Sequence, residues 1–306
     1  MAFIQTERGE YMRKKLTAVL LAATMLLTSG VTVFAHDALP ISYLALGADL
    51  SPQEQMTVLS LLGLSDINVD DYDIISITNA DEHEYLDKYL DASIIGTRAL
   101  SSVLVVGKEA GNGIHVTTKN ISYCTEGMYR NALLTAGIED ADITVAGPFS
   151  ISGTAALVGA IKAYETMTGE EIDDENLDAA NDELVLTGKL VEDIGDSEKA
   201  EDLMALVKQE VAENKLTSAE DIQNVVDQAC DQLDIQLSEE NQKQIAELMK
   251  KIEGLDLDVD KLKDQAKDLY QKLENLDFHV DKESVGNFFT RIIDAIVKFF
   301  QGLFGK

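Results

Sequence analysis

The chain has 306 residues, of which 55 are acidic and 25 basic, and its formal net charge at pH 7 is −30. This charge argues against nucleic acid as a partner, because proteins bind nucleic acids by neutralising phosphates with lysine and arginine. It favours solubility and an affinity for cations. The length allows one large domain or two modest ones.

Residues 1–35 have the organisation of a secretory signal peptide. Three basic residues at 13–15 precede an apolar run over 16–27, and the segment ends in an A-x-A-like pattern at 33–35. The apolar run is too short to cross a membrane, so we expect a cleaved leader. Four basic and two acidic residues would leave with it, which gives the mature chain a net charge of −32. We therefore expect a secreted or extracytoplasmic protein, with peripheral association with the cell envelope as an option.

Strand-like and helix-like segments alternate over residues 45–194, which predicts an α/β domain. Ser51, Pro52 and Glu54 form a strong helix start. Short β-branched runs predict strands, and Asn79 predicts the cap of a second helix. In chain order the expected elements are helix 51–62, strand 72–78, helix 79–90, strands 101–107 and 113–118, helix 122–136 and strand 142–147.

The predicted elements from residue 72 to residue 147 follow the order β-α-β-β-α-β, which matches a ferredoxin-like split unit. The two central strands are joined by the glycine-containing loop 108–112, so we expect them to form a hairpin. Pro148 predicts the end of the last strand. Further helices at 152–167 and 173–186 would complete the layer. The predicted fold class is α+β: this unit with extra helices, followed by an all-α acidic helical module.

The segment 120–157 combines a cysteine, several hydroxyls and a run of small residues. A phosphate loop would need G-x-G-x-x-G or a lysine followed by Ser or Thr after a glycine loop, and neither is present. The G-x-S-x-G pattern of a nucleophilic serine is also absent. We therefore interpret the small residues as a stripe for close helix packing and assign no catalytic residue. The stripe consists of Gly153, Ala155, Ala156, Gly159, Ala160 and Ala163.

Cys124 and Cys230 are the two cysteines of the chain. In an exported protein they could form one disulfide. They lie, however, in segments that we predict as different domains, so two separately buried thiols is the favoured interpretation. A catalytic cysteine would need a histidine close by, which the sequence alone does not place.

The histidines and acidic clusters predict no cofactor and no metal centre. His36 would become the mature N-terminus, but a copper site there lacks a second nearby imidazole. For His83 and His115 we expect surface or half-buried positions. The acidic clusters 66–73 and 256–264 lack the glycine and the final acid of an EF-hand loop. Weak cation binding remains an alternative.

Several phrases of the sequence resemble those of the YpuA-like family of exported bacterial proteins of unknown function. They are "NISYCTEGMYRNALLTAGIEDADITVAGPFSISGTAALVGAIKAYE", "EHEYL", "IGTRALSS" and "GIHVTTKNI". The resemblance covers roughly residues 45–192. It implies export from a Gram-positive-type bacterium, and it supplies no established activity and no catalytic residues.

From residue 196 to 281 every segment has a helical pattern, which predicts an acidic, coiled-coil-like helical module. Thr217 and Glu220 have the spacing of a capping box. From Ile245 to Leu276, apolar residues alternate at intervals of three and four, which is an unbroken heptad pattern.

Gly254 interrupts this pattern, so it forms either one long helix or two helices hinged at the glycine. The apolar stripe needs a partner in both cases. We favour an antiparallel bundle with helices at 197–213 and 218–235, and hence a monomer. A coiled-coil dimer is the alternative.

The last segment, 282–306, predicts an amphipathic helix with a wide apolar face and a net charge of +2. A cationic, Phe-rich helix of this kind suits a membrane interface or an envelope protein partner. The alternative is that the same face closes the helical bundle. The residues expected to face the membrane or partner are Phe288, Phe289, Ile292, Ile296, Phe299, Phe300, Leu303 and Phe304.

These observations favour an exported cell-envelope protein that is not an enzyme and that uses its helical C-terminal part for interactions. One alternative is an extracytoplasmic protein that binds a small ligand or a cation in the α/β domain. Another is a cryptic hydrolase in that domain, using Cys124, Ser152 or acidic residues.

Overall fold

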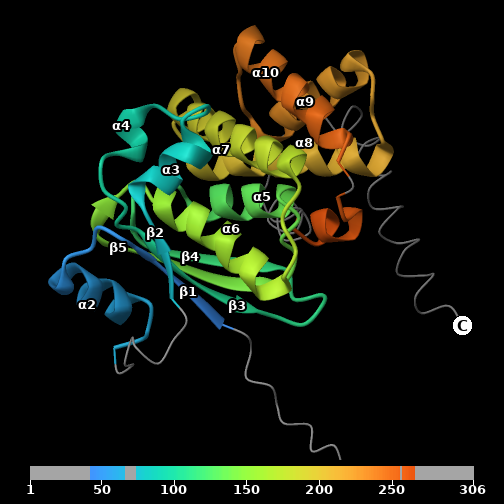
Figure 1. The fold of residues 1–306 in the computed structure, drawn as a ribbon. Helices are drawn as coiled ribbons and strands as arrows, with labels where there is room; N and C mark the ends of the chain where they lie inside the picture. Colours follow the sequence, from blue (N-terminus) through green and yellow to red (C-terminus); the bar gives the residue numbers. More distant parts are fainter. Residues whose placement is uncertain (1–41, 66–73, 256, 266–306) are drawn as a thin grey trace, which may run out of the picture. The chain divides into compact units, whose positions relative to one another are not determined.

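A computed structural model describes residues 42–65, 74–255 and 257–265. Within them, a mixed β-sheet is covered by helices (Figure 1). The strands are β1 (Ser42–Gly47), β2 (Ile74–Ile77), β3 (Ser102–Gly107), β4 (Ile114–Ile121) and β5 (Ala141–Ile151). The helices are α2 (Pro52–Leu61), α3 (Asn79–Leu86), α4 (Ala92–Ile95), α5 (Glu126–Thr135), α6 (Thr154–Thr168), α7 (Asp174–Ile194), α8 (Ser197–Asn214), α9 (Ala219–Leu233) and α10 (Glu239–Glu253).

The sheet has the strand order β2-β1-β3-β5-β4. The two outer pairs, β1 with β2 and β4 with β5, are parallel. The two inner pairs, β1 with β3 and β3 with β5, are antiparallel. The α+β class is therefore correct, but the ferredoxin-like arrangement is wrong, and β1 is a strand that the sequence did not predict.

The predicted hairpin fails because β5 lies between β3 and β4. After β4 the chain returns through α5, and a helical crossover of this kind makes consecutive strands parallel. The loop before β4 is held against the start of β5, since the Asp140 carboxylate accepts hydrogen bonds from the amides of Gly111 and Gly113. A short glycine-containing loop thus joins strands that are not neighbours.

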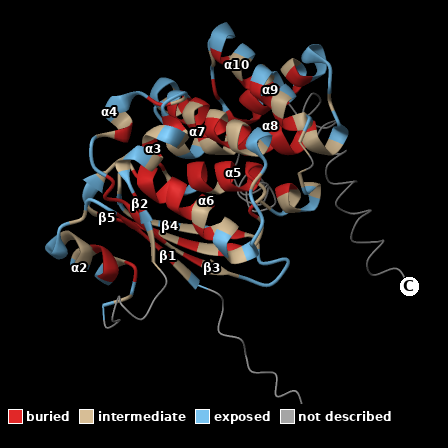
Figure 2. Cartoon of the chain, in the orientation of Figure 1, coloured by how far each residue is buried: buried red, intermediate tan, exposed pale blue. Residues whose placement is uncertain are grey.

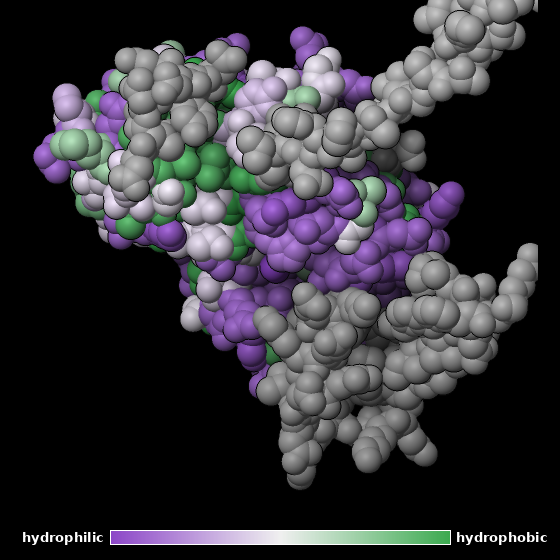
Figure 3. Space-filling model, turned by 90° about the horizontal axis from the view of Figure 1, so that it is seen from below, coloured by the Kyte–Doolittle hydropathy of each residue, from purple (hydrophilic) through white to green (hydrophobic). Residues whose placement is uncertain are grey.

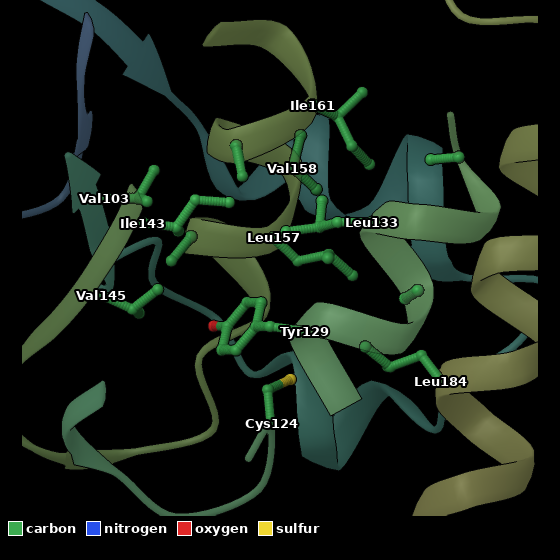
Figure 4. Packing of buried hydrophobic residues seen from close by; sticks show 14 of the residues in the cluster. Val103, Cys124, Tyr129, Leu133, Ile143, Val145, Leu157, Val158, Ile161 and Leu184 are labelled. Carbon is green, nitrogen blue, oxygen red and sulfur yellow. The ribbon is translucent and has the colours of Figure 1, made fainter. Parts of the chain in front are cut away.

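Helix α6 packs against one face of the sheet at its centre (Figure 1). A Cβ on Gly159 would lie 2.9 Å from the Cβ of Ala45 and 3.0 Å from Cγ1 of Val103. The small residues of α6 therefore let the helix approach the strands closely, as predicted. Figure 4 shows Leu157 and Val158 of α6 in the core that this packing creates.

The opposite face of the sheet is covered unevenly. Over β1, Leu44 and Leu46 pack with Val58 and Leu59 of α2. Figure 2 shows the burial of these elements, and Figure 3 shows this side of the molecule from below, with an apolar area beside a hydrophilic one. Over β4 the outward residues are polar, and the side chain of His115 is 68% exposed. A sheet with one covered and one partly solvated face explains the alternation along β4.

Local signals placed some boundaries correctly and others one residue away. The capping box of Ser51 with Glu54 is present, with Pro52 as the first helical residue. Helix α3 is capped by Thr78 instead of Asn79. Helix α9 is capped by Ser218 through the amide of Asp221, so the predicted Thr217 box is wrong.

Pro148 does not end its strand, since β5 continues to Ile151. The register between β4 and β5 shifts between Lys119 and Ile121, and Asn120 there has a φ of 59°. A bulge of this kind leaves residues outside the regular ladder, where the missing N–H of proline does no harm.

Helices α7 to α10 share a second apolar core. Ile245, Leu248 and Ile252 of the heptad pattern are buried in it, so this part of the stripe packs within the chain. Helix α10 ends at Gly254, and a further helical turn occupies 259–265. Up to residue 265, the heptad pattern is therefore divided between two helices. The rest of the pattern lies outside the described residues.

Gly195, where we divided the chain, caps the end of α7 with a φ of 74°. Both α7 and α8 contact α5, so the helical part packs directly on the α/β part. Separate domains at 45–194 and 196–281 stay a prediction. Within the described ranges, no helix has both the length and the apolar character needed to cross a membrane.

Candidate functional site

A pocket of about 460 Å³ opens between α3, the segment around α4, the end of β5 and the start of α6. We call it the Glu82 pocket, after the acidic residue in its wall. Phe149 and Tyr123 contribute aromatic surface, and Phe149 is 50% exposed. Most of the other polar residues carry hydroxyls, namely Ser93, Thr97, Ser101, Ser122, Ser152 and Thr154.

Glu82 is held in place by the start of α3. The capping box of Thr78 and Asp81 fixes the first turn of the helix, and Glu82 follows directly. Its Oε1 accepts a hydrogen bond from Oγ1 of Thr154 at 2.7 Å, and its Oε2 accepts one from Nδ2 of Asn79 at 3.2 Å. The residue is only 1% exposed. Burial raises the pKa of the Glu82 carboxyl, because both partners are neutral and do not offset the lost hydration.

The start of α6 forms the wall facing Glu82. Gly153 has a φ of +102°, and a Cβ there would lie 2.6 Å from the hydroxyl oxygen of Tyr129. This hydroxyl donates to the carbonyl of Gly153 at 2.6 Å. Ser101 accepts a hydrogen bond from the amide of Ala156 at 2.9 Å, so it serves the first turn of α6. Two hydrogen bonds, from Tyr129 to Gly153 and from Ala156 to Ser101, therefore hold the start of α6 and with it Thr154 in position.

Two further hydroxyls lie beside this wall. The hydroxyl oxygens of Ser152 and Thr154 are 3.2 Å apart. Ser122 donates to the carbonyl of Ile151 at 3.1 Å. Thr154 and Ser122 donate their single hydroxyl protons to Glu82 and Ile151, and Ser152 donates its own to Thr154, so these three hydroxyls offer acceptor oxygens to a ligand.

Arg98 is the basic residue of the pocket lining, and it already has partners. Its Nη2 lies 2.9 Å from Oε2 of Glu54 and donates to the carbonyl of Asp49 at 2.8 Å. Hydrogen bonds from the Ser51 amide and from Arg98 lower the pKa of the Glu54 carboxyl to about 2. The charge of Arg98 is therefore balanced by Glu54 and not by Glu82.

Cys124 lies behind this pocket and does not line it. The residue is fully buried, and its amide donates to the carbonyl of Ser152 at 2.9 Å. Figure 4 shows its side chain next to Tyr129. Burial raises the pKa of the Cys124 thiol to about 12, so it is not a thiolate at neutral pH. Thr125, its neighbour, caps α5 by accepting from the amide of Met128.

The two cysteines are separate buried thiols, as the favoured interpretation predicted, since Cys230 lies in the core of the helical part. No histidine of the described residues serves Cys124 or Ser152. His83 pairs with Asp87 at 2.5 Å, and His115 lies on the outward face of β4.

Acid–base catalysis by two carboxylates also has no counterpart in this pocket. Glu82 is the carboxylate among the residues that line it, whereas glycoside hydrolysis requires a pair. In the described part of the chain, no group of three or more His, Cys, Asp or Glu side chains could hold a metal ion.

A second pocket, of about 550 Å³, lies between α3 and α7. Its lining is acidic, and one of these acids, Asp178, accepts hydrogen bonds from Tyr89 and from Lys251, which lower the pKa of the Asp178 carboxyl. This second pocket has no buried acidic or basic side chain in its lining, so the Glu82 pocket is the stronger candidate site.

The residues predicted to face a membrane or partner lie outside the described residues. These are Phe288, Phe289, Ile292, Ile296, Phe299, Phe300, Leu303 and Phe304, and the predicted signal peptide and the acidic cluster 66–73 also fall outside. Glu82 was not predicted as a site residue from the sequence. A weak signal was available, because Glu82 lies one helical turn before Leu86, which is fully buried.

Comparison with known proteins gives a family but no activity. A family model described as a protein of unknown function (DUF1002) matches residues 46–269. The chain is also 37% identical over 295 residues to the uncharacterized protein YpuA of Bacillus subtilis (strain 168), covering 95% of this chain and all of the relative. No solved structure gives a significant match. The chain therefore belongs to the DUF1002 family, the YpuA-like proteins of unknown function.

Proposed function

We propose that this protein is an exported, non-enzymatic protein of the cell envelope whose Glu82 pocket binds a small, hydroxyl-rich ligand. The observation that carries the proposal is a fully buried carboxyl in the wall of a cavity otherwise rich in hydroxyls. Export rests on the leader pattern in residues 1–35.

The chemistry of the pocket supports a sugar-like ligand. Its volume of about 460 Å³ falls in the range of small-molecule sites, which is roughly 300–1,000 Å³. The hydroxyls of Ser93 and Thr97 can pair with ligand hydroxyls in either direction, and the Ser152 hydroxyl can accept from them. The half-exposed ring of Phe149 offers an apolar face to a sugar ring.

A binding screen tests this function. The mature chain from residue 36 is titrated with saccharide fragments of bacterial cell wall, and the rise in melting temperature and the heat of binding are measured. Thr97 is an exposed residue of the pocket lining, so Thr97→Trp should fill the mouth. Ser60→Trp, on the exposed face of α2 outside the pocket, is the matched control.

We expect at least one saccharide to bind the wild type and Ser60→Trp with equal affinity, and to bind Thr97→Trp at least tenfold more weakly. Binding that Thr97→Trp leaves unchanged would place the ligand elsewhere. The absence of any saccharide binding would overturn the proposed function.

We also propose that residues 282–306 hold the protein at a membrane surface or an envelope partner. The support is the segregation of apolar residues such as Phe288, Phe299 and Phe304 from the charged residues in an assumed helix. Co-sedimentation with anionic liposomes, with and without residues 282–306, tests this. Equal binding of both forms would contradict it.

A further inference from the structure

We infer that the ligand of the Glu82 pocket presents an ammonium group to the Glu82 carboxylate, so that the pocket takes a hydroxylated amine such as an amino sugar. This inference rests on the proposed function and narrows it from sugar-like ligands in general to those that carry a cation.

The Glu82 carboxylate lacks a counter-charge among the described residues. Each oxygen of Glu82 accepts one hydrogen bond from a neutral group, the Thr154 hydroxyl or the Asn79 amide. None of the ion pairs within the described residues includes Glu82; the two nearest in sequence join Lys162 to Asp81 and His83 to Asp87. A buried carboxylate with no cation loses hydration that two neutral hydrogen bonds replace only in part.

The charged groups around Glu82 do not fill this role. His83 favours the ionised form of Glu82 but has its own partner in Asp87, and Asp49 disfavours that form. Arg98 is bound to Glu54. The thiol of Cys124 is fully buried and is not charged at neutral pH. A cation brought by the ligand would therefore meet an acid that the protein itself leaves unpaired.

An ammonium group fits this pocket better than a metal ion does. Calcium and magnesium require several oxygen ligands of which more than one is usually a carboxylate, and this pocket supplies a single one. An ammonium needs fewer partners, because it has three N–H donors that can be shared between one carboxylate and neighbouring hydroxyls. Ser152 and Thr154 provide such hydroxyls 3.2 Å apart, next to the acid. The net charge of −30 also favours cationic ligands at the surface.

The experiment compares two ligands that differ only at nitrogen. Calorimetric titrations use the disaccharide of glucosamine and the same disaccharide in its N-acetylated form, at pH 7 and low salt. Three proteins are titrated: the wild type, Glu82→Gln and Glu84→Gln. Glu84 is an exposed acid of the same helix and does not line the Glu82 pocket, so it controls for net charge.

We expect the wild type and Glu84→Gln to bind the amine at least tenfold more tightly than the acetylated sugar. In Glu82→Gln, the preference for the amine over the acetylated sugar should disappear. The melting temperature of this variant checks that it is folded. Equal affinity for both sugars would overturn the inference and leave the proposed function standing. A preference that persists in Glu82→Gln would overturn it as well, and binding of neither sugar would reject the amino-sugar ligand.

Discussion

The hydroxyl of Thr154 donates a hydrogen bond of 2.7 Å to Oε1 of Glu82 and thereby joins the first residue of α6 to the first turn of α3. The two residues are 72 positions apart in the chain. This contact places a buried acid at the start of the helix that covers the sheet, and the Glu82 pocket opens beside it.

Cys124 should react slowly with alkylating reagents in the folded protein. The residue is 0% exposed and its thiol has a pKa of about 12, so little thiolate is present or accessible at pH 8. We expect Cys124 to be labelled at least a hundredfold more slowly in the native protein than in denaturant. Mass spectrometry of the peptide that contains Cys124 measures the two rates. Rapid labelling of the native protein would revive the hydrolase hypothesis.

Lys208 and Glu183 form a buried ion pair that ties α8 to α7. The Lys208 ammonium lies 2.9 Å from Oε1 of Glu183 and also donates to the carbonyl of Asn131 and to Oγ1 of Thr135. Both side chains are fully buried. Lys208→Met would leave the carboxylate unpaired, and we expect it to lower the free energy of unfolding by about 3–5 kcal/mol in urea titrations.

The double variant Lys208→Met with Glu183→Leu should recover most of this loss, because no unpaired charge remains in the core. Loss of stability that is simply additive across the two single variants would show that the pair is not coupled.

Glu210 should make stability depend on pH. It is 7% exposed, and burial together with the nearby Glu213 raises the pKa of its carboxyl to about 7, against hydrogen bonding by Asn214 and the charge of Lys263. The folded state therefore holds its proton more tightly than the unfolded state, whose pKa is near 4.5. The contribution of Glu210 to stability is complete below pH 4.5 and is lost as the pH rises to about 7.

Glu210→Gln should remove this loss. The variant should gain stability over the wild type by on the order of 3 kcal/mol between about pH 4 and pH 8, measured by urea unfolding at each pH. Glu109→Gln, at an exposed loop residue, should follow the wild type. Parallel curves for Glu210→Gln and wild type would contradict the prediction.

Two glycines should respond in opposite directions to the same substitution. Gly159→Ala would place a Cβ 2.9 Å from that of Ala45, so we expect a loss of about 1–3 kcal/mol in thermal or urea unfolding. Gly254 has a φ of −70°, and a Cβ there would meet only the carbonyl of Lys251 at 3.4 Å. Gly254→Ala should therefore raise stability by about 0.4–1 kcal/mol. Equal effects would refute the close approach of α6.

The sequence predicted the features that depend on neighbouring residues. The cap of α2 needs only Ser51, Pro52 and Glu54, and the close packing of α6 follows from small residues at helical spacing. The interior position of Ile245 follows from the same kind of pattern.

The predicted caps of α3 and α9 were each wrong by one residue, but the strand order and the Glu82 pocket were missed because they depend on residues distant in the chain. The order of β3, β5 and β4 is set by the crossover through α5, so a short loop before β4 indicated the wrong partner. The Glu82 pocket exists because Thr154 and Ser101 meet α3 in space. In the sequence, Glu82 is one acid in a charged helix, and only its spacing of four residues from Leu86 separates it from the exposed Glu84.

The titration of Glu82 shows whether its carboxylate meets the ammonium group of the ligand. Carbon-detected NMR of protein labelled at the glutamate carboxyl carbons, with the Glu82 signal assigned by its absence in Glu82→Gln, gives the pKa with and without the glucosamine disaccharide. The account predicts a pKa above 4.5 in the ligand-free protein, because the carboxyl is buried, and a fall when the ammonium binds. A pKa that does not change at saturating amine would show that Glu82 does not contact the ligand and would contradict the account.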